Sequence, residues 1–295
     1  MRAPRLILLL LLVLPAAAGA GQDSVVTVLV NGIERTALLH APAAIEAGKS
    51  YPLVIGYHGG LGTAEGYAVQ SDLFAKGEAA GFLVACPQGT PVLGNPRHRV
   101  WDSGKEYARV TGGADDVGFT AALIDRIASL YTVDPRRVFA TGFSNGGQMS
   151  YLLAFALADR IAAIAPMSGG RSAEGLRPAR PVPVLHIHGT DDTVYPFEGG
   201  LGSHSIGRVP HVPIPEVIAE WVRFDEARPT AETELHQGWQ IDRHRGLVPV
   251  DLVLVDGMGH QIAGGNDDHL PGQTLKHRPD SIARALEFFA AHPLP

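Results

Sequence analysis

The apolar positions of the chain fall into short runs that alternate with longer amphipathic stretches. Unbroken runs of four to eight residues rich in Val, Ile and Leu are typical of strands buried on both faces, whereas longer amphipathic stretches are typical of helices. Strands are predicted at 52–57, 82–86, 138–141, 161–166, 182–188 and 248–255. Helices are predicted at 64–80, 115–131, 148–154, 216–224 and 281–291.

The N-terminal part of this pattern differs, because two strand-like runs (25–30 and 35–40) flank Asn31-Gly32 and predict a β-hairpin. Beyond it, the regular alternation of strands and helices predicts an α/β fold with a mostly parallel sheet and helices on both faces. Segments 88–113 and 196–214 are rich in Gly and Pro, and we expect long loops there. No repeat or interdomain linker interrupts residues 21–295, so a single domain is predicted.

The first twenty residues have the pattern of a secretory signal peptide. Arg2 and Arg5 precede the apolar run 6–14, and Ala18-Gly19-Ala20 fits a signal-peptidase cleavage site. We therefore expect export to the periplasm or the medium, with a mature chain beginning near Gly21 or Gln22. The apolar run is too short to span a bilayer, and no cysteine near the cleavage site could carry a lipid, so no stable membrane anchor is expected.

Composition narrows the possible partners. Charged residues make up 18% of the 295 residues and hydrophobic residues 45%, which is enough to bury a large core. The net charge of −6 contains no block of like charges, which argues against nucleic acid as a partner. The single cysteine, Cys86, cannot form an internal disulfide and is expected to be a packed, inert thiol. Nothing in the sequence predicts an oligomeric state.

The main chemical signal is Gly142-Phe143-Ser144-Asn145-Gly146, which lies between a predicted strand and a predicted helix. A strand that turns sharply into a helix through G-x-S-x-G is the nucleophile elbow of an α/β-hydrolase. The glycines allow the strained backbone at Ser144 and the close approach of neighbouring elements. The start of the following helix directs backbone N–H groups at negative charge that develops beside the serine.

A nucleophilic serine needs a histidine to take its proton and a carboxylate to orient that histidine. In α/β-hydrolases the acid and the histidine follow the serine in that order, each after a later strand. Asp191 and Asp192 follow the strand 182–188, and His260 follows the strand 248–255, with Asp256 at the end of that strand. Since loops at the carboxyl ends of parallel strands converge at one sheet edge, we expect these groups to lie near Ser144.

Several blocks together resemble one family of secreted esterases, which contains polyhydroxybutyrate depolymerase-like enzymes and feruloyl or acetylxylan esterases (carbohydrate esterase family 1-like). The matching blocks are His58-Gly59-Gly60, Asp115-Asp116-Val117-Gly118-Phe119, 133–138, 141–147, 163–166, the H-G-T-x-D segment His188–Asp192, and Gly257-x-Gly259-His260. They extend over residues 52 to about 265. The resemblance implies an α/β-hydrolase fold and a cofactor-independent serine esterase that acts on a small or oligomeric ester.

The resemblance also implies roles for individual residues. Ser144 is expected to be the nucleophile, and His260 the general base and then acid. Asp192 is favoured as the orienting acid by the H-G-T-x-D spacing, with Asp191 as its competitor and Asp256 a more distant alternative. The oxyanion hole is expected to combine the backbone N–H of Asn145 with a second N–H, from either Gly60 or Leu61.

Other polar residues have simpler interpretations. His186 and His188 share a strand face, but no third or fourth ligand is spaced to complete a metal site, so no metal is expected. Asp267-Asp268-His269 is interpreted as a solvated loop. Ser203-His204-Ser205-Ile206-Gly207 lacks the first glycine of an elbow and a preceding strand. His58 is expected to stiffen its loop by hydrogen bonding, while Trp101 could line the substrate pocket or anchor its loop.

The chain departs from its family around the mouth of the expected site. Cysteine pairs that many relatives carry before Trp101 and around 237–239 are absent, and Gln261-Ile262 replaces an aromatic residue and a proline after His260. These differences leave the substrate open. Because the chain ends after its last helix, feruloylated or acetylated saccharides or hydroxybutyrate oligomers are favoured over crystalline polymer. A serine peptidase or acylaminoacyl hydrolase, or a non-catalytic secreted binding protein, are the alternative functions.

Overall fold

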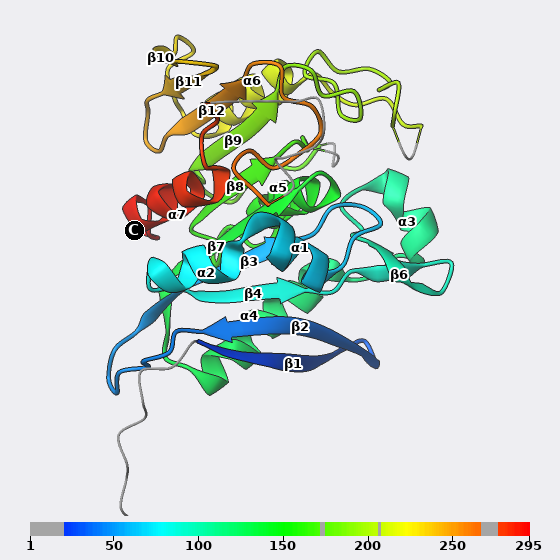
Figure 1. Ribbon diagram of the computed structural model, residues 1–295, viewed down its shortest axis with the longest axis vertical. Coiled ribbons are helices and arrows are strands. Elements are labelled where there is room, and N and C mark those ends of the chain that lie inside the picture. The colour runs from blue at the N-terminus through cyan, green and yellow to red at the C-terminus, as the bar shows by residue number, and fades with distance from the viewer. Residues whose placement is uncertain (1–20, 172–174, 206–207, 267–276) are drawn as a thin grey trace, which may run out of the picture.

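A ten-stranded sheet forms the centre of the molecule in the computed structural model, which describes residues 21–171, 175–205, 208–266 and 277–295 (Figure 1). The strands that pair in parallel occupy its middle, and an antiparallel strand pair lies at each edge. In spatial order the strands are β1 (Gln22–Val30), β2 (Ile33–Ala41), β4 (Leu83–Pro87), β3 (Tyr51–Tyr57), β7 (Val133–Phe143), β8 (Ala163–Met167), β9 (Val184–Gly189), β12 (Val250–Val255), β11 (Trp239–His244) and β10 (Glu232–His236).

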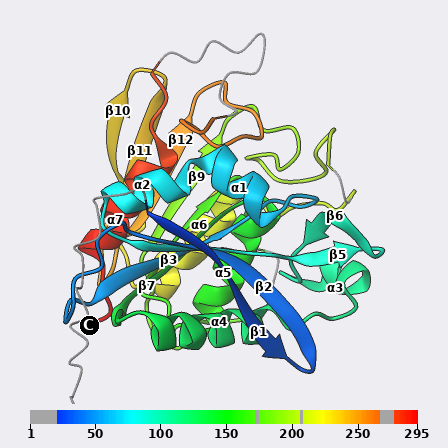
Figure 2. The same cartoon turned by 60° about the horizontal axis from the view of Figure 1, so that its bottom comes forward.

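Helices cover both faces of this sheet. One layer lies in front of the sheet in Figure 1 and consists of α1 (Ala64–Ser71), α2 (Leu73–Ala79) and α7 (Ser281–Ala291). The opposite layer consists of α4 (Asp116–Leu130), α5 (Asn145–Ala156) and α6 (Ile214–Phe224). Figure 2 shows α4 and α5 along the lower side of the sheet, away from α1 and α2.

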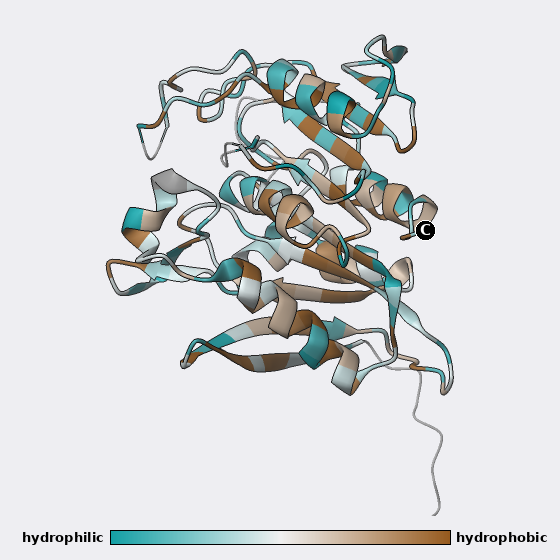
Figure 3. Cartoon of the chain, turned by 180° about the vertical axis from the view of Figure 1, so that it is seen from behind, coloured by the Kyte–Doolittle hydropathy of each residue, from teal (hydrophilic) through white to brown (hydrophobic). Residues whose placement is uncertain are grey.

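The central strands explain why the two layers form. Every residue of β3, β4, β8 and β9 is buried, so these strands present apolar side chains to both faces. Viewed from behind and coloured by hydropathy, the central strands are largely hydrophobic beneath more polar helix surfaces (Figure 3). The predicted α/β-hydrolase architecture, mostly parallel and with helices on both faces, is thus confirmed.

Some elements differ from the sequence prediction. The stretch predicted as one helix over 64–80 is two helices, because Asp72 adopts a left-handed conformation (φ 57°) between them. Segment 88–113 contains a small antiparallel sheet of β5 (Thr90–Val92) and β6 (Asn95–Val100) and the helix α3 (Lys105–Thr111). The hairpin β10–β11 was not predicted, and every residue of β10 is exposed. Segment 196–213 has no helix or strand among its described residues.

The proposed signal peptide, residues 1–20, and Asp267-Asp268-His269 lie outside the described residues. Among the helices that the structure describes, none is long and apolar enough to cross a bilayer. Cys86 is fully buried in β4, and burial raises the pKa of its thiol, as expected for a packed cysteine.

Candidate active site

The sharp turn from β7 into α5 presents Ser144 at the carboxyl edge of the sheet. Ser144 adopts φ 55° and ψ −118°, a strained conformation for a residue with a side chain, and its N–H donates to the carbonyl of Met167 (2.8 Å). A Cβ at Gly142 would lie 2.4 Å from the carbonyl oxygen of Gly146, and one at Gly146 would lie 2.1 Å from that of Tyr57. The geometry is therefore that of a nucleophile elbow, and only glycine fits at positions 142 and 146, two residues before and two residues after the serine.

Asp192 and His260 form a hydrogen-bonded pair although 68 residues separate them in sequence. His260 Nδ1 lies 2.7 Å from Asp192 Oδ2, while Asp192 Oδ1 accepts from the N–H groups of Val194 (2.9 Å) and Tyr195 (2.8 Å). Burial alone would raise the pKa of Asp192, but its bonds to His260 and to the backbone lower the pKa below its usual value. The carboxylate therefore stays ionised, and a carboxylate beside Nδ1 favours the tautomer in which that nitrogen donates.

The two competing aspartates are placed differently. Asp191 is exposed, and its carboxylate accepts only the hydroxyl of its neighbour Thr190 (2.9 Å) among the described residues. Asp256 is also exposed, at the start of the loop after β12. Of the three aspartates, Asp192 is the one whose carboxylate contacts His260, in agreement with the spacing of the H-G-T-x-D segment.

The acid loop and the histidine loop are fastened to each other beyond this single contact. The Thr190 hydroxyl accepts from the N–H of Gly257 (2.8 Å), and the N–H of Asp191 donates to the carbonyl of Met258 (3.0 Å). A Cβ at Gly189 would lie 2.0 Å from that same Met258 oxygen. The glycine and threonine of H-G-T thus allow the loops after β9 and β12 to approach closely enough for Asp192 to reach His260.

His260 also lies beside the elbow. Its ring centroid is 4.7 Å from that of Phe143, the residue directly before Ser144, and its side chain is 14% exposed. The Ser144 hydroxyl makes no hydrogen bond to His260 within the described part of the chain. Catalytic hydrogen bonds are often long before substrate binds, so this arrangement is compatible with the predicted pairing of His260 with Ser144.

The candidate oxyanion donors separate clearly. Leu61 is in a left-handed conformation (φ 64°), and its N–H is engaged by the carbonyl of Arg99 (2.7 Å). Neither the N–H of Gly60 nor that of Asn145 has a partner among the described residues, and Asn145 is the first residue of α5, where N–H groups lack helical acceptors. Gly60 and Asn145 therefore offer free donors, whereas Leu61 does not.

A cavity of about 310 Å³ opens from these groups, and its wall is mainly apolar. It is lined by Gly60, Leu61, Val92, Val100, Tyr107, Val110, Ser144, Asn145, Gln148, Val194, Tyr195, Ser205, Val209 and His211. The side chain of His211 stacks on Tyr195 with centroids 3.9 Å apart, and burial lowers its pKa to about 4, so it is neutral at physiological pH. Segments 88–113 and 196–214, both predicted as long loops, supply half of these lining residues.

A second, larger space of about 550 Å³ is an open groove between the loop after β3 and α1. It is bordered by His58, Glu65 and Gln70, and Phe143 forms part of its floor. Ser144 does not line this groove, whereas the smaller cavity is lined by Ser144 and by both residues with free N–H donors, Gly60 and Asn145.

The histidines on β9 form a buried chain behind the acid. Tyr151 of α5 bonds to His186 Nδ1 (2.9 Å), His186 Nε2 lies 3.1 Å from His188 Nδ1, and His188 Nε2 lies 2.8 Å from the carbonyl of Tyr195. Burial lowers the pKa of His188 to about 4 and holds that of His186 well below its usual value, so both rings are neutral. Every ring nitrogen thus has a hydrogen-bond partner. No group of three or more possible metal ligands was found among the described residues.

His58 and Trp101 anchor the loops around the site. His58 Nδ1 donates to the carbonyl of Gly59 (2.7 Å), and its Nε2 accepts from the N–H of Gly89 (3.0 Å), so His58 stiffens its loop as expected. Trp101 is fully buried and makes three hydrogen bonds to His58 and Asn145, so of its two predicted roles it has that of a loop anchor.

The cavity residues Tyr195 and His211 were not predicted from the sequence, because no spacing in the sequence relates them to Ser144.

Comparison with known proteins agrees with this geometry. No family model matches the sequence. Among curated proteins, "Feruloyl esterase B" of Piromyces equi is 31% identical over 243 residues, which cover 78% of this chain and 43% of the relative. "Putative esterase NocK" of Nocardia uniformis is 32% identical over 267 residues, covering 83% of this chain and 75% of the relative. The chain thus spans less than half the length of the first of these relatives.

Solved structures resemble the fold at lower sequence identity. An acetyl xylan esterase from Aspergillus awamori superposes with a TM-score of 0.61 at 17% identity, covering 81% of this chain and 94% of that one. An S-formylglutathione hydrolase from Agrobacterium tumefaciens gives 0.56 at 14% identity, covering 83% and 90%. Fold and elbow define an α/β-hydrolase. Within that class, the chain belongs to the esterase family of its curated relatives, which includes feruloyl and acetylxylan esterases.

Proposed function

We propose that this protein is a serine carboxylic-ester hydrolase that works through the triad Ser144, His260 and Asp192. The observation that carries the proposal is the 2.7 Å contact between Asp192 and His260 next to the Ser144 elbow. Membership in an esterase family supports the same chemistry. Gly60 and Asn145 form the oxyanion hole in this proposal, and Leu61 does not contribute.

The mechanism is a double displacement. Ser144 Oγ attacks the ester carbonyl while His260 Nε2 takes its proton, and the oxyanion accepts hydrogen bonds from Gly60 and Asn145. His260 then gives the proton to the departing alcohol, which leaves an acyl group on Ser144. Water, deprotonated by His260, attacks the acyl-enzyme and releases the acid. All of these steps use groups of the chain itself.

We propose an ester with an apolar acyl group as the substrate class, since the cavity beside Ser144 is lined by Val92, Val110, Val194 and Tyr107. Feruloyl saccharide esters and hydroxybutyrate oligomers both meet this description, and acetyl esters would leave much of the cavity unfilled. Kinetics on methyl ferulate, a hydroxybutyrate trimer and an acetylated xylan oligomer rank these possibilities. A peptide or acylated amino acid that is cleaved faster than all three esters would favour the peptidase alternative.

Export belongs to the proposal as well. The pattern of Arg2, the apolar run 6–14 and Ala18-Gly19-Ala20 supports a cleaved signal peptide and a periplasmic or extracellular enzyme. Cleavage near Gly21 leaves β1, which begins at Gln22, complete.

The test is Ser144→Ala. We expect turnover of short p-nitrophenyl esters to fall by at least about 10³-fold, because the nucleophile is lost, while the circular dichroism spectrum is unchanged. A matched control is Ser150→Ala in α5, the helix that follows Ser144. The Ser150 hydroxyl donates to the carbonyl of Gly146 (3.0 Å) within that helix and has no proposed role in the chemistry. Activity retained in Ser144→Ala would contradict the assignment of the nucleophile.

A further inference from the structure

Trp101 connects the two halves of the oxyanion hole. Its main-chain N–H donates to Asn145 Oδ1 (2.7 Å), its carbonyl accepts from Asn145 Nδ2 (3.2 Å), and its indole N–H donates to the carbonyl of His58 (2.9 Å). Asn145 carries one free N–H donor, and His58 begins the loop that carries the other, Gly60. The distance between the two donors therefore depends on where Trp101 is held.

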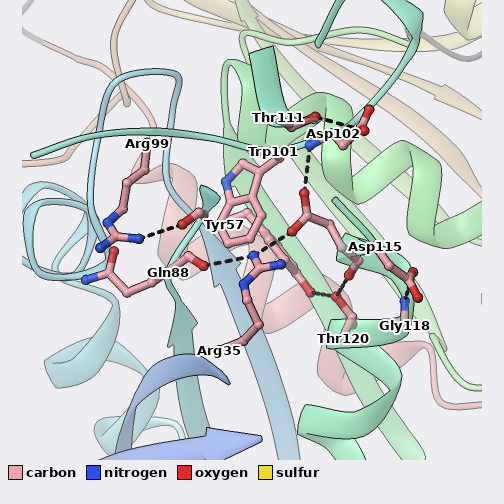
Figure 4. Close-up of polar contacts among 12 residues, drawn as sticks. Arg35, Tyr57, Gln88, Arg99, Trp101, Asp102, Thr111, Asp115, Gly118 and Thr120 are labelled. Atoms are coloured by element: carbon pink, nitrogen blue, oxygen red, sulfur yellow. Dashed lines mark hydrogen bonds and ion pairs between the residues drawn. The ribbon is translucent and has the colours of Figure 1, made fainter. Parts of the chain in front are cut away.

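Trp101 lies in a segment without regular structure between β6 and α3, so something else has to fix its position. The residue that follows it, Asp102, donates its N–H to Asp116 Oδ2 (2.7 Å). The other carboxylate oxygen of Asp116, Oδ1, accepts from Arg35 of β2 (2.6 Å). Figure 4 shows Arg35 and Asp102 reaching this carboxylate from either side, next to Trp101.

Arg35 is itself held in place. Its guanidinium also donates to the carbonyl of Gln88 (3.1 Å; Figure 4). It also lies 4.3 Å from the ring centroid of Phe119. The Asp116 side chain is fully buried, and that of Arg35 is 10% exposed. A buried ion pair recovers its desolvation cost poorly and can often be replaced by apolar residues without loss of stability. Stability alone is thus a weak reason for a charge pair at this position.

We propose that Asp116, held by Arg35, is a positioning residue for the oxyanion hole: it fixes Asp102 and hence Trp101, which sets the spacing of Asn145 and the His58–Gly60 loop. The inference rests on the proposed esterase function. It gives a role to Asp115-Asp116-Val117-Gly118-Phe119, which triad chemistry leaves unused. In that segment Asp115 caps α4 through the N–H of Gly118 (2.7 Å), Asp116 binds Arg35 and Asp102, and Phe119 packs under Arg35.

The experiment compares Asp116→Asn with Asp115→Asn, the same substitution one residue earlier at an exposed cap that asparagine also satisfies. An uncharged side chain with one acceptor oxygen cannot serve both Arg35 and Asp102 as the carboxylate does. We expect kcat per fluorophosphonate-titrated site to fall by about 10- to 100-fold in Asp116→Asn, with KM within about twofold, because the oxyanion forms only in the transition state. Asp115→Asn should retain wild-type kcat.

A second readout separates positioning from general damage. Replacing the ester carbonyl oxygen by sulfur weakens hydrogen bonds to the developing anion, so the ratio of kcat/KM for an oxo ester over its thiono analogue reports on the oxyanion hole. This ratio should fall by several-fold in Asp116→Asn and stay at the wild-type value in Asp115→Asn. A merely structural role would lower the melting temperature and leave both the ratio and kcat per titrated site unchanged, which would overturn the inference.

The double variant Arg35→Met/Asp116→Leu covers the case in which Asp116→Asn does not fold. It removes both charges together, which buried ion pairs tolerate, yet still deprives Asp102 of its acceptor. A folded double variant with the same loss of kcat and of the oxo/thiono ratio supports the inference, and wild-type values overturn it. Activity retained in Ser144→Ala would instead remove the proposed function, so the two failures are distinguishable.

Discussion

At the scale of single residues, the proposed site depends on backbone geometry as much as on the side chains of the proposed triad. Ser144 has a positive φ, and the glycines at 142 and 146 stand where any Cβ would meet main-chain atoms. Leu61 also has a positive φ, and its N–H donates to the carbonyl of Arg99, so it is not free for the proposed oxyanion hole. A conformation of this kind belongs to one residue and its contacts, and it decides which of two adjacent N–H groups can act.

The choice between the adjacent aspartates gives the residue-scale prediction. Asp192→Asn should lower kcat by about 10³- to 10⁴-fold, because an amide in place of the carboxylate no longer holds Nδ1 of His260 protonated and oriented. Asp191→Asn is the matched control and should change kcat by less than about twofold, since its carboxylate is exposed. Steady-state hydrolysis of p-nitrophenyl butyrate measures both. A larger loss of kcat in Asp191→Asn than in Asp192→Asn would contradict the assignment of Asp192 as the acid.

The sequence pointed to Ser144, Asp192 and His260, because the elbow motif, the H-G-T-x-D spacing and the order of the strands are local signals. The structure shows the elbow and the contact between Asp192 and His260, and the catalytic roles stay a prediction. It left Gly60 and Leu61 open, since the carbonyl that engages Leu61 belongs to Arg99, 38 residues away along the chain. It also could not choose between two roles for Trp101, whose partners are the main chain of His58 and the side chain of Asn145. Long-range contacts to backbone atoms leave little trace in residue spacing.

At the scale of secondary-structure elements, the apolar runs of the sequence predicted the central strands of the sheet well and its edge strands poorly. The apolar runs 52–57 and 82–86 correspond to β3 and β4 within one residue. The hairpin β10–β11 extends the sheet at its edge with a fully exposed β10 and a β11 in which only Trp239 and Ile241 are buried, so no apolar run marked it. The break at Asp72 between α1 and α2 follows from one left-handed residue, and amphipathic periodicity continues across it. Edge strands and single-residue breaks therefore need the three-dimensional fold to be seen.

A buried acid joins two elements of this fold and makes stability depend on pH. Asp225 follows α6, is fully buried, and accepts the N–H of Val182 (2.9 Å) just before β9. Burial raises its pKa to about 8, although the Val182 N–H and Arg180 act in the opposite direction. The folded state thus keeps a proton on Asp225 that the unfolded chain loses near pH 4, so this group lowers stability as pH rises from about 4 to about 8.

Asp225→Asn should remove this dependence. Between pH 5 and 7.5 the free energy of unfolding should fall more steeply for the wild type than for the variant, by about 1 kcal/mol per pH unit. Urea unfolding at several pH values measures the difference. The exposed neighbour provides the control Glu226→Gln, which should keep the wild-type slope. Parallel curves for the wild type and Asp225→Asn would show that the carboxyl group is ionised in the folded state.

At the scale of the whole molecule, one sheet brings together segments that lie far apart in the chain. The loops after β3, β7, β9 and β12 meet at one edge, and they carry Gly60, Ser144, Asp192 and His260. Half of the residues that line the cavity beside them come from 88–113 and 196–214. The proposed catalytic residues thus lie at the sheet edge, and segments 88–113 and 196–214 add part of the cavity lining beside them.

The proposed export makes a prediction for the full chain. Expressed with residues 1–20 in a bacterial host with a Sec pathway, the protein should appear outside the cytoplasm with Gly21 or Gln22 as its first residue. Intact-mass analysis of the exported fraction determines that residue. A charge substitution in the apolar run, Leu10→Arg, is the control and should keep the protein inside the cell. An exported protein that still begins at Met1 would contradict the predicted cleavage.

The central claim is that Ser144 is an activated nucleophile, and a fluorophosphonate probe tests it most directly. The probe reacts with a serine only where a base and an oxyanion hole activate it. Peptide mapping after labelling should find one adduct, on Ser144. Labelling should be lost in Ser144→Ala and strongly slowed in His260→Ala. An adduct on another residue, or undiminished labelling of Ser144→Ala, would contradict the account.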